Sequence, residues 1–366
     1  MMSERVEGAG DASMSTLPEG LLFGLGNPLL DITANVDVEF LKKYHMNPND
    51  AILGGEYQTT LTQDMLAKYQ DIEYSAGGSC LNSFRIAQWH LKKPNIVTNT
   101  GCIGQDDFGK ILQEKAKEAG VNVQLQIDPK EKTGSCAVLV TGSNKLRSLC
   151  AFLNAANCFK IDHIRKPELK ALIEKAHYFY STGYFLVVSL PSLLEVADHA
   201  LQNNKMFCFN LSAGYVLEFY KNSVEELLPY VDLIFGNDQE FTAFAAAFGI
   251  ESNDMKEVAR QVQAMSKKNS QRKRIVIITR GADSVVVCDE KGEIQEFPAK
   301  RIPDSEIAET NGAGDGFVGG FLSQFIQGYP LDRCVACGHY TASEVIKQHG
   351  VKVPKEPHFV YENKSL

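Results

Sequence analysis

Three features that would place a chain in a common class are missing from this sequence. No window approaches the ~18–20 uninterrupted apolar residues that a membrane-spanning helix needs, and residues 1–20 contain no apolar core of a signal peptide. Basic residues are not in excess, because 37 Lys and Arg stand against 45 Asp and Glu, a net charge of −8. We therefore expect no nucleic acid and no membrane among the main partners.

A disulfide framework is also missing. The nine cysteines are scattered and odd in number, which favours a reduced, cytoplasmic setting. Cys334 and Cys337 form one CxxC pair, but no second pair exists to complete a zinc site. The basic run 267–274 leaves nuclear targeting as an alternative, although most such runs are solvated loops.

Two familiar nucleotide-binding signatures are absent. Gly109-Lys110 is followed by an apolar residue rather than Ser or Thr, so there is no Walker P-loop, and the His-Arg-Asp of protein kinases does not occur. The stretch 24–31 could be mistaken for a dinucleotide fingerprint. Its third glycine position holds Leu29, however, and Pro28 breaks the helix start, which makes an oxidoreductase a weak alternative.

Strand and helix patterns alternate along most of the chain. We expect strands at 21–26, 31–36, 134–140, 176–181, 206–211, 231–235, 275–279 and 284–288. We expect helices at 79–91, 108–119, 189–201, 224–228, 238–248, 313–326 and 332–347. This alternation predicts an α/β fold in which a mostly parallel central sheet is covered by helices on both faces.

Two regions depart from this alternation of strands and helices and indicate the domain organisation. They are strand-rich pieces near 30–58 and 133–153, which we expect to form a small β-rich lid from about 30–75 and 131–155. The lid would fold over a main α/β domain of residues 19–360. Residues 1–18 are expected to form a disordered tail.

The most informative motif is the stretch 309–320, Glu-Thr-Asn-Gly-Ala-Gly-Asp-Gly-Phe-Val-Gly-Gly. Gly312, Ala313 and Gly314 allow the backbone to turn its N–H groups toward one point at a helix start, where such groups attract phosphate. A carboxylate repels phosphate, so Asp315 belongs there only if it handles a proton. Asp is also a common helix cap, but a cap does not require three small residues before it. The motif therefore indicates phosphoryl transfer with Asp315 as general base.

Two further motifs indicate a site for sugar hydroxyls. Gly77-Gly78 would let a ligand approach the backbone closely, and Ser79 and Asn82 lie three apart at a helix start and face one way. An ordinary glycine turn with a Ser cap is the alternative. Asn27 and Asp31 follow the first strand at its carboxyl end, where open α/β sheets bind ligands. Asp31 could accept hydrogen bonds from two neighbouring hydroxyls of one sugar.

The remaining candidates are weaker. Asn237 and Glu240 open a predicted helix and could hold magnesium through waters, and the same spacing is typical of a capping box. Thr279 and Gly281 close a β-branched run and could face nucleotide phosphates. Arg147 in the lid could neutralise phosphate charge on closure, although a single arginine is usually a solvated surface residue.

Taken together, these motifs resemble the ribokinase-like superfamily of sugar and nucleoside kinases. Within it the chain is similar, over roughly 20–358, to the members that phosphorylate adenosine. The pieces that carry the resemblance are GNPLLDI (26–32), AGGSCLNS (76–83), AQWHL (87–91), RSLCAFLNAAN (147–157), FGNDQE (235–240) and TNGAGDGFVGGF (310–321). The resemblance implies a ribokinase-like α/β fold with a β-rich lid, and the conversion of ATP and adenosine to ADP and AMP with Mg²⁺ (purine salvage).

The resemblance also implies a role for each matching residue. Asp315 would deprotonate the 5′-hydroxyl, the N–H groups of 312–314 would stabilise the transferring phosphoryl group, and Arg147 would steady the γ-phosphate. The other matching positions are Asn27, Asp31, Gly78 and Asn82 at the ribose, and Leu29, Ser79, Cys136, Leu149 and Phe185 around the adenine. Asn237 and Glu240 match the magnesium motif, and His339 lies where the family places a residue near the base of ATP. Beyond these matches, we expect Gly77 and Asn311 in the substrate site, and Asn237, Thr279 and Gly281 at ATP.

Two departures from the family pattern stand out. Ala51 occupies a position where vertebrate members usually carry glutamine near the adenosine base, and Glu309 replaces a commoner aspartate, which puts a monovalent-cation site in doubt. A monomer is the family-level expectation, since the adenosine-phosphorylating members do not usually pair through their lids. Two alternatives stay open: the same chemistry on another nucleoside or a free sugar, and a nucleoside-binding protein that has lost catalysis.

Overall fold

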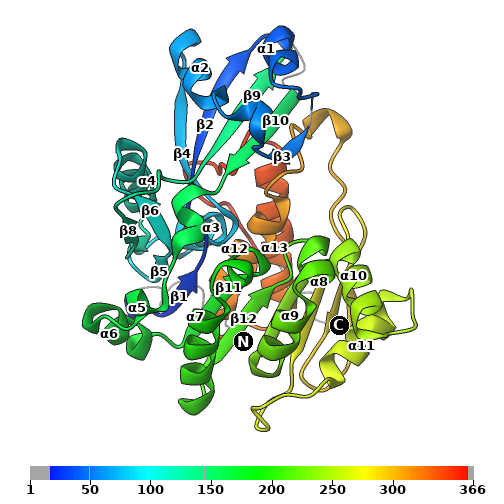
Figure 1. The fold of residues 1–366 in the computed structure, drawn as a ribbon. Coiled ribbons are helices and arrows are strands. Elements are labelled where there is room, and N and C mark those ends of the chain that lie inside the picture. Colours follow the sequence, from blue (N-terminus) through cyan, green and yellow to red (C-terminus); the bar gives the residue numbers. More distant parts are fainter. Residues whose placement is uncertain (1–16, 49, 143–145, 362–366) are drawn as a thin grey trace, which may run out of the picture.

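The computed structural model describes residues 17–48, 50–142 and 146–361 (Figure 1). Of the expected tail at 1–18, residues 1–16 lie outside the described residues. The chain forms a large helix-covered sheet with a smaller sheet beside it. A separate two-stranded sheet consists of β6 (Cys102–Gly104) and β8 (Gln126–Asp128).

The central sheet has nine strands and is mostly parallel. In spatial order they are β16 (Ile294–Phe297), β15 (Val285–Cys288), β14 (Ile275–Thr279), β13 (Leu233–Asn237), β12 (Met206–Asn210), β11 (Tyr178–Thr182), β1 (Leu22–Leu25), β5 (Val97–Thr100) and β7 (Asn122–Val123). β15 runs antiparallel to both of its neighbours, β14 and β16, and the other described strand pairs of this sheet are parallel. The α/β expectation is therefore confirmed, with an antiparallel edge that the strand and helix rhythm did not predict.

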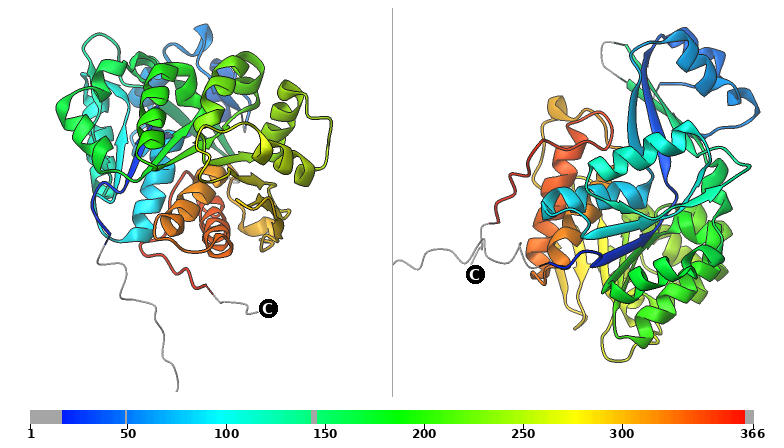
Figure 2. Two further views of the ribbon diagram at one scale, coloured as in Figure 1. Left: turned by 90° about the horizontal axis from the view of Figure 1, so that it is seen from below. Right: turned by 90° about the vertical axis from the view of Figure 1, so that its left-hand side faces the viewer.

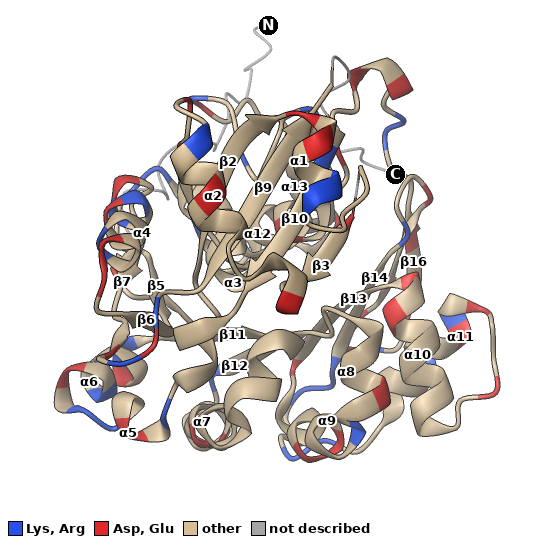
Figure 3. Ribbon diagram, turned by 45° about the horizontal axis from the view of Figure 1, so that its top comes forward, with Lys and Arg blue, Asp and Glu red and all other residues tan. Residues whose placement is uncertain are grey.

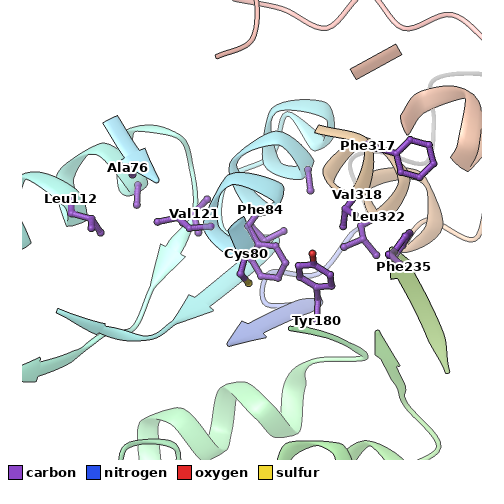
Figure 4. Packing of buried hydrophobic residues seen from close by; sticks show 14 of the residues in the cluster. Ala76, Cys80, Phe84, Leu112, Val121, Tyr180, Phe235, Phe317, Val318 and Leu322 are labelled. Atoms are coloured by element: carbon purple, nitrogen blue, oxygen red, sulfur yellow. The ribbon is translucent and has the colours of Figure 1, made fainter. Parts of the chain in front are cut away.

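Helices cover both faces of this sheet, as Figure 2 shows from below. One core cluster joins the sheet to α3 (Ser79–Leu91), α4 (Asp107–Glu118), α12 (Ala313–Phe325) and α13 (Leu331–Ile346). The other joins it to α5 (Ile161–Ile164), α6 (Pro167–Lys175), α7 (Gly183–Gln202), α8 (Gly214–Phe219), α9 (Lys221–Leu227), α10 (Asp238–Phe248) and α11 (Met255–Ala264). Figure 4 shows the first cluster, where Phe84 of α3 packs against Tyr180 of β11 with ring centroids 5.9 Å apart.

The smaller sheet, which we call the lid, has five strands and rises above the carboxyl end of β1 (Figure 1). In order they are β3 (Ala51–Leu53), β10 (Leu146–Phe152), β9 (Ser135–Thr141), β2 (Leu29–Val36) and β4 (Glu73–Gly77), with α1 (Val38–Lys43) and α2 (Leu61–Lys68) beside them. Its strands come from both segments expected to build it, although β2 and β4 reach one and two residues past the expected limits.

Helix α7 is longer than the sequence predicted. It begins at Gly183 rather than at 189, and it is by length and composition apolar enough to cross a membrane. Its backbone is broken at Ser189 (φ −150°, ψ 72°), two residues before Pro191. Leu193 and Val196 from its apolar side are buried in the core beneath the sheet, which accounts for the apolar composition by packing.

The basic run 267–274 is not a solvated loop. Arg274 is fully buried and donates to the carbonyl oxygens of Leu228, Val231 and Val262. Lys267 and Arg272 both form ion pairs with the buried Asp232, and Lys268 lies over the ring of Tyr230. Three of the run's five basic side chains are therefore built into the fold, which corrects the sequence-based expectation.

Candidate active site

The carboxylate of Asp315 lies between the starts of two helices. Asp315 is in the first turn of α12, and its two oxygens accept hydrogen bonds from Ser79 Oγ (2.6 Å) and Asn82 Nδ2 (3.0 Å) at the start of α3. These residues are more than 230 positions apart in sequence. The structure therefore brings together the two motifs that the sequence marked separately.

Close packing of α3 on α12 allows this contact. Gly319 faces α3, and a Cβ there would lie 2.5 Å from the carbonyl oxygen of Ser83 and 2.6 Å from a methyl carbon of Ile86. Real Cβ atoms do not come so near, so only glycine permits this helix spacing. The second glycine pair of the motif thus sets the distance between Asp315 and its donors.

Gly77 and Gly78 each require glycine, but for different structural reasons. A Cβ on Gly77 would lie 2.4 Å from a carboxylate oxygen of Asp31, and one on Gly78 would lie 2.1 Å from the carbonyl oxygen of Asn27. Gly78 also has a φ of +93°, which L side chains rarely adopt. The pair therefore lets Asp31 and the end of β1 lie directly against the start of α3.

Burial raises the pKa of two carboxyl groups at the site, those of Asp315 and Asp31. Desolvation raises the pKa of Asp315 to about 6, and the hydrogen bonds from Ser79 and Asn82 oppose this shift. Desolvation raises the pKa of Asp31 to about 7, against the attraction of Arg85 and Arg147. Asp315 is thus ionised at neutral pH yet basic enough to accept a proton, as a general base requires.

The residue before helix α12 is its N-cap, Gly312, whose backbone is in the left-handed region at φ +80°. The first-turn N–H groups of α12 have no partners four residues earlier within the helix, so they are available to an anion in principle. The N–H of Ala313 is already used, because it donates to the carbonyl oxygen of Thr310 at 3.2 Å. Of the three N–H groups expected to face a phosphoryl group, this one would have to exchange its partner.

A cavity of about 360 Å³ opens beside Asp315. It collects residues from the ends of several parallel strands and from the α12 start, as the rule for open α/β sheets requires. Expected site residues that line it are Ser79, Asn237, Glu240, Thr279, Asn311, Gly312, Gly314 and Asp315. The sequence missed Tyr184, Asn210 and Ser212, which also line it; each follows or ends a predicted strand, which was the available signal.

Asn237 and Glu240 form a complete capping box at the start of α10. Asn237 Oδ1 accepts from the N–H of Glu240 (2.8 Å), and the carboxylate of Glu240 accepts from the N–H (3.0 Å) and Nδ2 (2.9 Å) of Asn237. The capping interpretation is confirmed. Burial also raises the pKa of Glu240. Among the described residues, no three His, Cys, Asp or Glu side chains are grouped so that they could hold a metal ion. The carboxylate of Glu240 is committed to Asn237, so this pair suits Mg²⁺ held through waters.

The lid supplies the other side of the site. Asp31 of β2 lies in register with Cys136 of β9, and Leu149 of the next strand, β10, is partly exposed. Arg147 of β10 forms a buried ion pair with Glu309, with Nη1 2.8 Å from Oε2. Asn27 donates to the carbonyl oxygen of Tyr184 (3.1 Å), and its own Oδ1 is buried and has no hydrogen-bond partner within the described chain.

Three expected site residues lie elsewhere. Phe185 is fully buried and packs edge-on against Phe159 in the core cluster on the α7 side of the sheet. His339 lines a separate cavity of about 800 Å³ between α13 and the loop after β16. Gly281 has a φ of +58° and nothing near its Cβ position. The structure does not gather these three around Asp315, so their roles stay predictions.

The model of the pfkB family carbohydrate kinases matches residues 53–358. The chain belongs to this family. It is 43% identical to adenosine kinase 2 of Arabidopsis thaliana over 341 residues, covering 93% of this chain and 98% of the relative. The crystal structure of Anopheles gambiae adenosine kinase with P1,P4-di(adenosine-5) tetraphosphate superposes with a TM-score of 0.84 at 46% identity, covering 94% and 100% of the two chains.

A second solved member agrees with this assignment. Adenosine kinase from Schistosoma mansoni, in complex with 2-fluoroadenosine, has a TM-score of 0.83 at 34% identity over 92% of this chain and 98% of that one. The fold is thus the ribokinase-like α/β fold expected from the motifs. This family member carries its expected general base in a raised-pKa, hydrogen-bonded setting at the mouth of a polar cavity.

Proposed function

We propose that the protein is an ATP-dependent adenosine kinase, which transfers the γ-phosphate of ATP to the 5′-hydroxyl of adenosine and releases AMP and ADP. The observation that carries the proposal is the Asp315 carboxylate, held between the starts of α3 and α12 beside the cavity. The similarity to adenosine kinases along more than nine tenths of the chain supports adenosine as the acceptor.

Each residue has a defined task in this proposal. Asp315 accepts the proton of the 5′-hydroxyl as its oxygen attacks phosphorus, and free N–H groups at the α12 start stabilise the charge on the transferring group. Asn27, with its unpaired buried Oδ1, accepts a hydrogen bond from a ribose hydroxyl. Asp31 accepts a second one when ionised, and closure of the lid excludes water from the reaction.

Kinases of this type use ATP together with Mg²⁺, which neutralises phosphate charge when bound. We propose that Asn237 and Glu240 hold the ion through waters. Both side chains line the cavity, and the carboxylate of Glu240 is already committed to two hydrogen bonds from Asn237. This arrangement supports an outer role for the pair rather than direct ligation. No residue set described in the structure supports a monovalent-cation site at Glu309, whose carboxylate pairs with Arg147.

An assay of acceptors tests the function. Adenosine, inosine, guanosine, ribose and fructose would each be incubated with labelled ATP, Mg²⁺ and either the native protein or Asp315→Asn. We expect phosphorylation of adenosine by the native protein and at least ~10²-fold lower turnover in the variant, because it lacks the general base, with nucleoside affinity changed only a few fold. Asp107→Asn, on an exposed side chain of α4, is the matched control.

The outcomes separate the alternatives. Preference for another nucleoside or a sugar would keep the chemistry and change the substrate. Tight adenosine binding without ADP formation would replace the kinase by a nucleoside-binding protein. Normal turnover in Asp315→Asn would remove this residue from the role of base.

We further propose that the enzyme acts as a monomer in the cytoplasm. All nine cysteines are free thiols, which fits a reducing compartment. Acidic and basic residues are interspersed in the view of Figure 3. A nuclear signal must present its basic side chains to a receptor. The run 267–274 is poorly suited to this, because three of its side chains are held in the fold: Arg274, Lys267 and Arg272. Light scattering and localisation of a tagged chain test these two points.

A further inference from the structure

One buried ion pair joins the lid to the main domain across 162 positions of sequence. The Arg147 side chain, on lid strand β10, is 5% exposed, and that of Glu309, on the loop before α12, is 9% exposed. Arg147 Nη1 lies 2.8 Å from Glu309 Oε2. The other oxygen of Glu309 accepts from the N–H of Gly350 at 3.0 Å. Glu309 therefore ties together the lid, the loop before the anion-binding helix start and the segment after α13.

A second ion pair links the same two parts of the molecule in a different environment. Lys352 and Glu73 of β4 approach to 2.6 Å, but their side chains are 42% and 56% exposed. Exposed pairs contribute little to stability, whereas a buried pair leaves an uncompensated charge when one partner is removed. Of these two links, only the one at Glu309 is placed to hold the lid.

The guanidinium of Arg147 is not fully used by this pair. Its Nε is buried and has no hydrogen-bond partner within the part of the chain that the structure describes, although an arginine has five N–H donors in a fixed fork. A Cβ on Gly350 would lie 3.2 Å from Nη1, so the chain packs tightly against the guanidinium. Arg147 is thus held in place but retains capacity for another anion.

In the proposed function, that anion is the γ-phosphate of ATP. Glu309 lies four residues before Ala313, the first residue of α12, so a phosphate there would bring a second negative charge close to the carboxylate. Two like charges compete for one arginine. A phosphate can accept two N–H groups of the guanidinium, whereas Glu309 offers it one oxygen, because the other accepts from the N–H of Gly350.

We propose that Glu309 is a positioning residue that latches Arg147, and with it the lid, and that the γ-phosphate of ATP displaces this carboxylate from the arginine. The displacement rests on the proposed function, whereas the latch itself does not. Glu309 thereby couples release of this ion pair to arrival of the triphosphate.

The test uses Glu309→Gln, which keeps the side-chain shape but removes the charge and one of the two acceptors. Hydrogen exchange of β9 and β10 in the protein without nucleotide should become at least threefold faster, because the lid is no longer held. The KM for ATP should fall about threefold to tenfold, because the competitor for Arg147 is gone. With a non-hydrolysable ATP analogue and adenosine bound, the exchange difference from the native protein should disappear.

Two controls make the result specific. Glu73→Gln breaks the exposed pair on the same lid and should change neither exchange nor KM. In an Arg147→Met background, Glu309→Gln should no longer lower the KM for ATP, because the arginine for which the two anions compete is absent. If Glu309→Gln folds poorly by thermal unfolding, Glu309→Asp, which keeps the charge but shortens the reach, should show the same signs with smaller effects.

Opposite results would overturn the proposal. A rise in KM for ATP would mean that Glu309 stays bound to Arg147 and orients it during catalysis. Unchanged exchange would mean that the pair does not hold the lid. If no acceptor is phosphorylated, the proposed function fails, but the exchange measurement on the protein alone still decides whether Glu309 latches the lid.

Discussion

The two sides of the site are built on different principles. On the side of the main domain, both oxygens of Asp315 are hydrogen-bonded by residues of α3, and α3 is locked to α12 through a glycine contact. On the lid side, the Nε of the buried Arg147 lacks a hydrogen-bond partner among the described residues, and its ion pair crosses between two parts of the fold. The difference indicates that the proposed proton acceptor is preorganised, whereas the charge proposed to bind phosphate can exchange partners.

Apart from Asp315→Asn, the largest effect should come from the lid side. We expect Arg147→Ala to lower turnover about 10²-fold, the usual loss for a group that stabilises transition-state charge. Adenosine affinity should fall much less, since the residues proposed to contact the ribose are others. Steady-state kinetics with direct adenosine titration separate the two quantities. A larger loss in adenosine binding than in turnover would mean that Arg147 binds adenosine rather than the transferring phosphate. The proposed difference between the two sides of the site would then be wrong.

The next effect tests whether the main-domain side is rigid because α3 and α12 are so close. Gly319→Ala places a methyl group 2.5 Å from the carbonyl oxygen of Ser83, which we expect to lower the free energy of unfolding by about 1–3 kcal/mol. Turnover should drop about tenfold, because a small displacement of Asp315 from its donors misplaces the base. Denaturant unfolding and kinetics measure both quantities.

Gly214→Ala is the matched control for this prediction. It lies in the first turn of α8, and the nearest atom to its added Cβ is 3.8 Å away. Equal behaviour of the two variants would show that the α3–α12 spacing does not control the site.

The same contrast explains which parts could be predicted from the sequence. The main-domain side is made of helix starts, whose glycines, caps and apolar spacing are contiguous in the chain; the bounds of α3 and α10 match the expected ones to the residue. Short strands such as β6 and β7, with three and two residues, carry too little periodicity to be found. The backbone break at Ser189 lies at the expected start of a helix, and the helical segment from Gly183 that precedes it was not predicted.

Long-range pairs were beyond the reach of such patterns. The sequence marked Glu309 as a departure and Arg147 as a single arginine, but nothing local relates two residues that lie 162 positions apart. Likewise, Ser79 was assigned to the adenine by resemblance, whereas its hydroxyl in the structure donates to Asp315. Tertiary packing decides these contacts, and the local sequence does not encode them.

The pH dependence of kcat/KM tests the role of Asp315 on the main-domain side. Because burial raises the pKa of Asp315 to about 6, the carboxylate is ionised above that pH and protonated below it. We therefore expect kcat/KM for adenosine to fall as the pH is lowered through about 6. Removing a donor that favours the ionised form raises the pKa further, so Ser79→Ala should move this acidic limb upward by about one pH unit, since a hydrogen bond to a charged group contributes about 1.5–3 kcal/mol.

Asp31 titrates nearby, with a pKa raised to about 7, and could produce a similar limb. The control is therefore Asp31→Asn: a limb near pH 6 that persists in this variant and moves only with Ser79→Ala belongs to Asp315. A limb that does not move in Ser79→Ala would contradict the assignment.

The smallest effect should come from the apolar part of the lid. Leu149 lies on β10 two residues after Arg147 and is partly exposed, in register with Ala51 of β3 and Val138 of β9. If it covers the adenine, Leu149→Ala removes apolar contact without touching a charge, and we expect the KM for adenosine to rise about threefold to tenfold with turnover nearly unchanged, since such contacts are worth about 1 kcal/mol or slightly more. Leu146→Ala, on the same strand and more exposed, should have no effect on either constant. Reduced turnover in Leu149→Ala would mean that this position also aligns Arg147, and the two functions of the lid, binding the base and supplying the charge, would then not be separable.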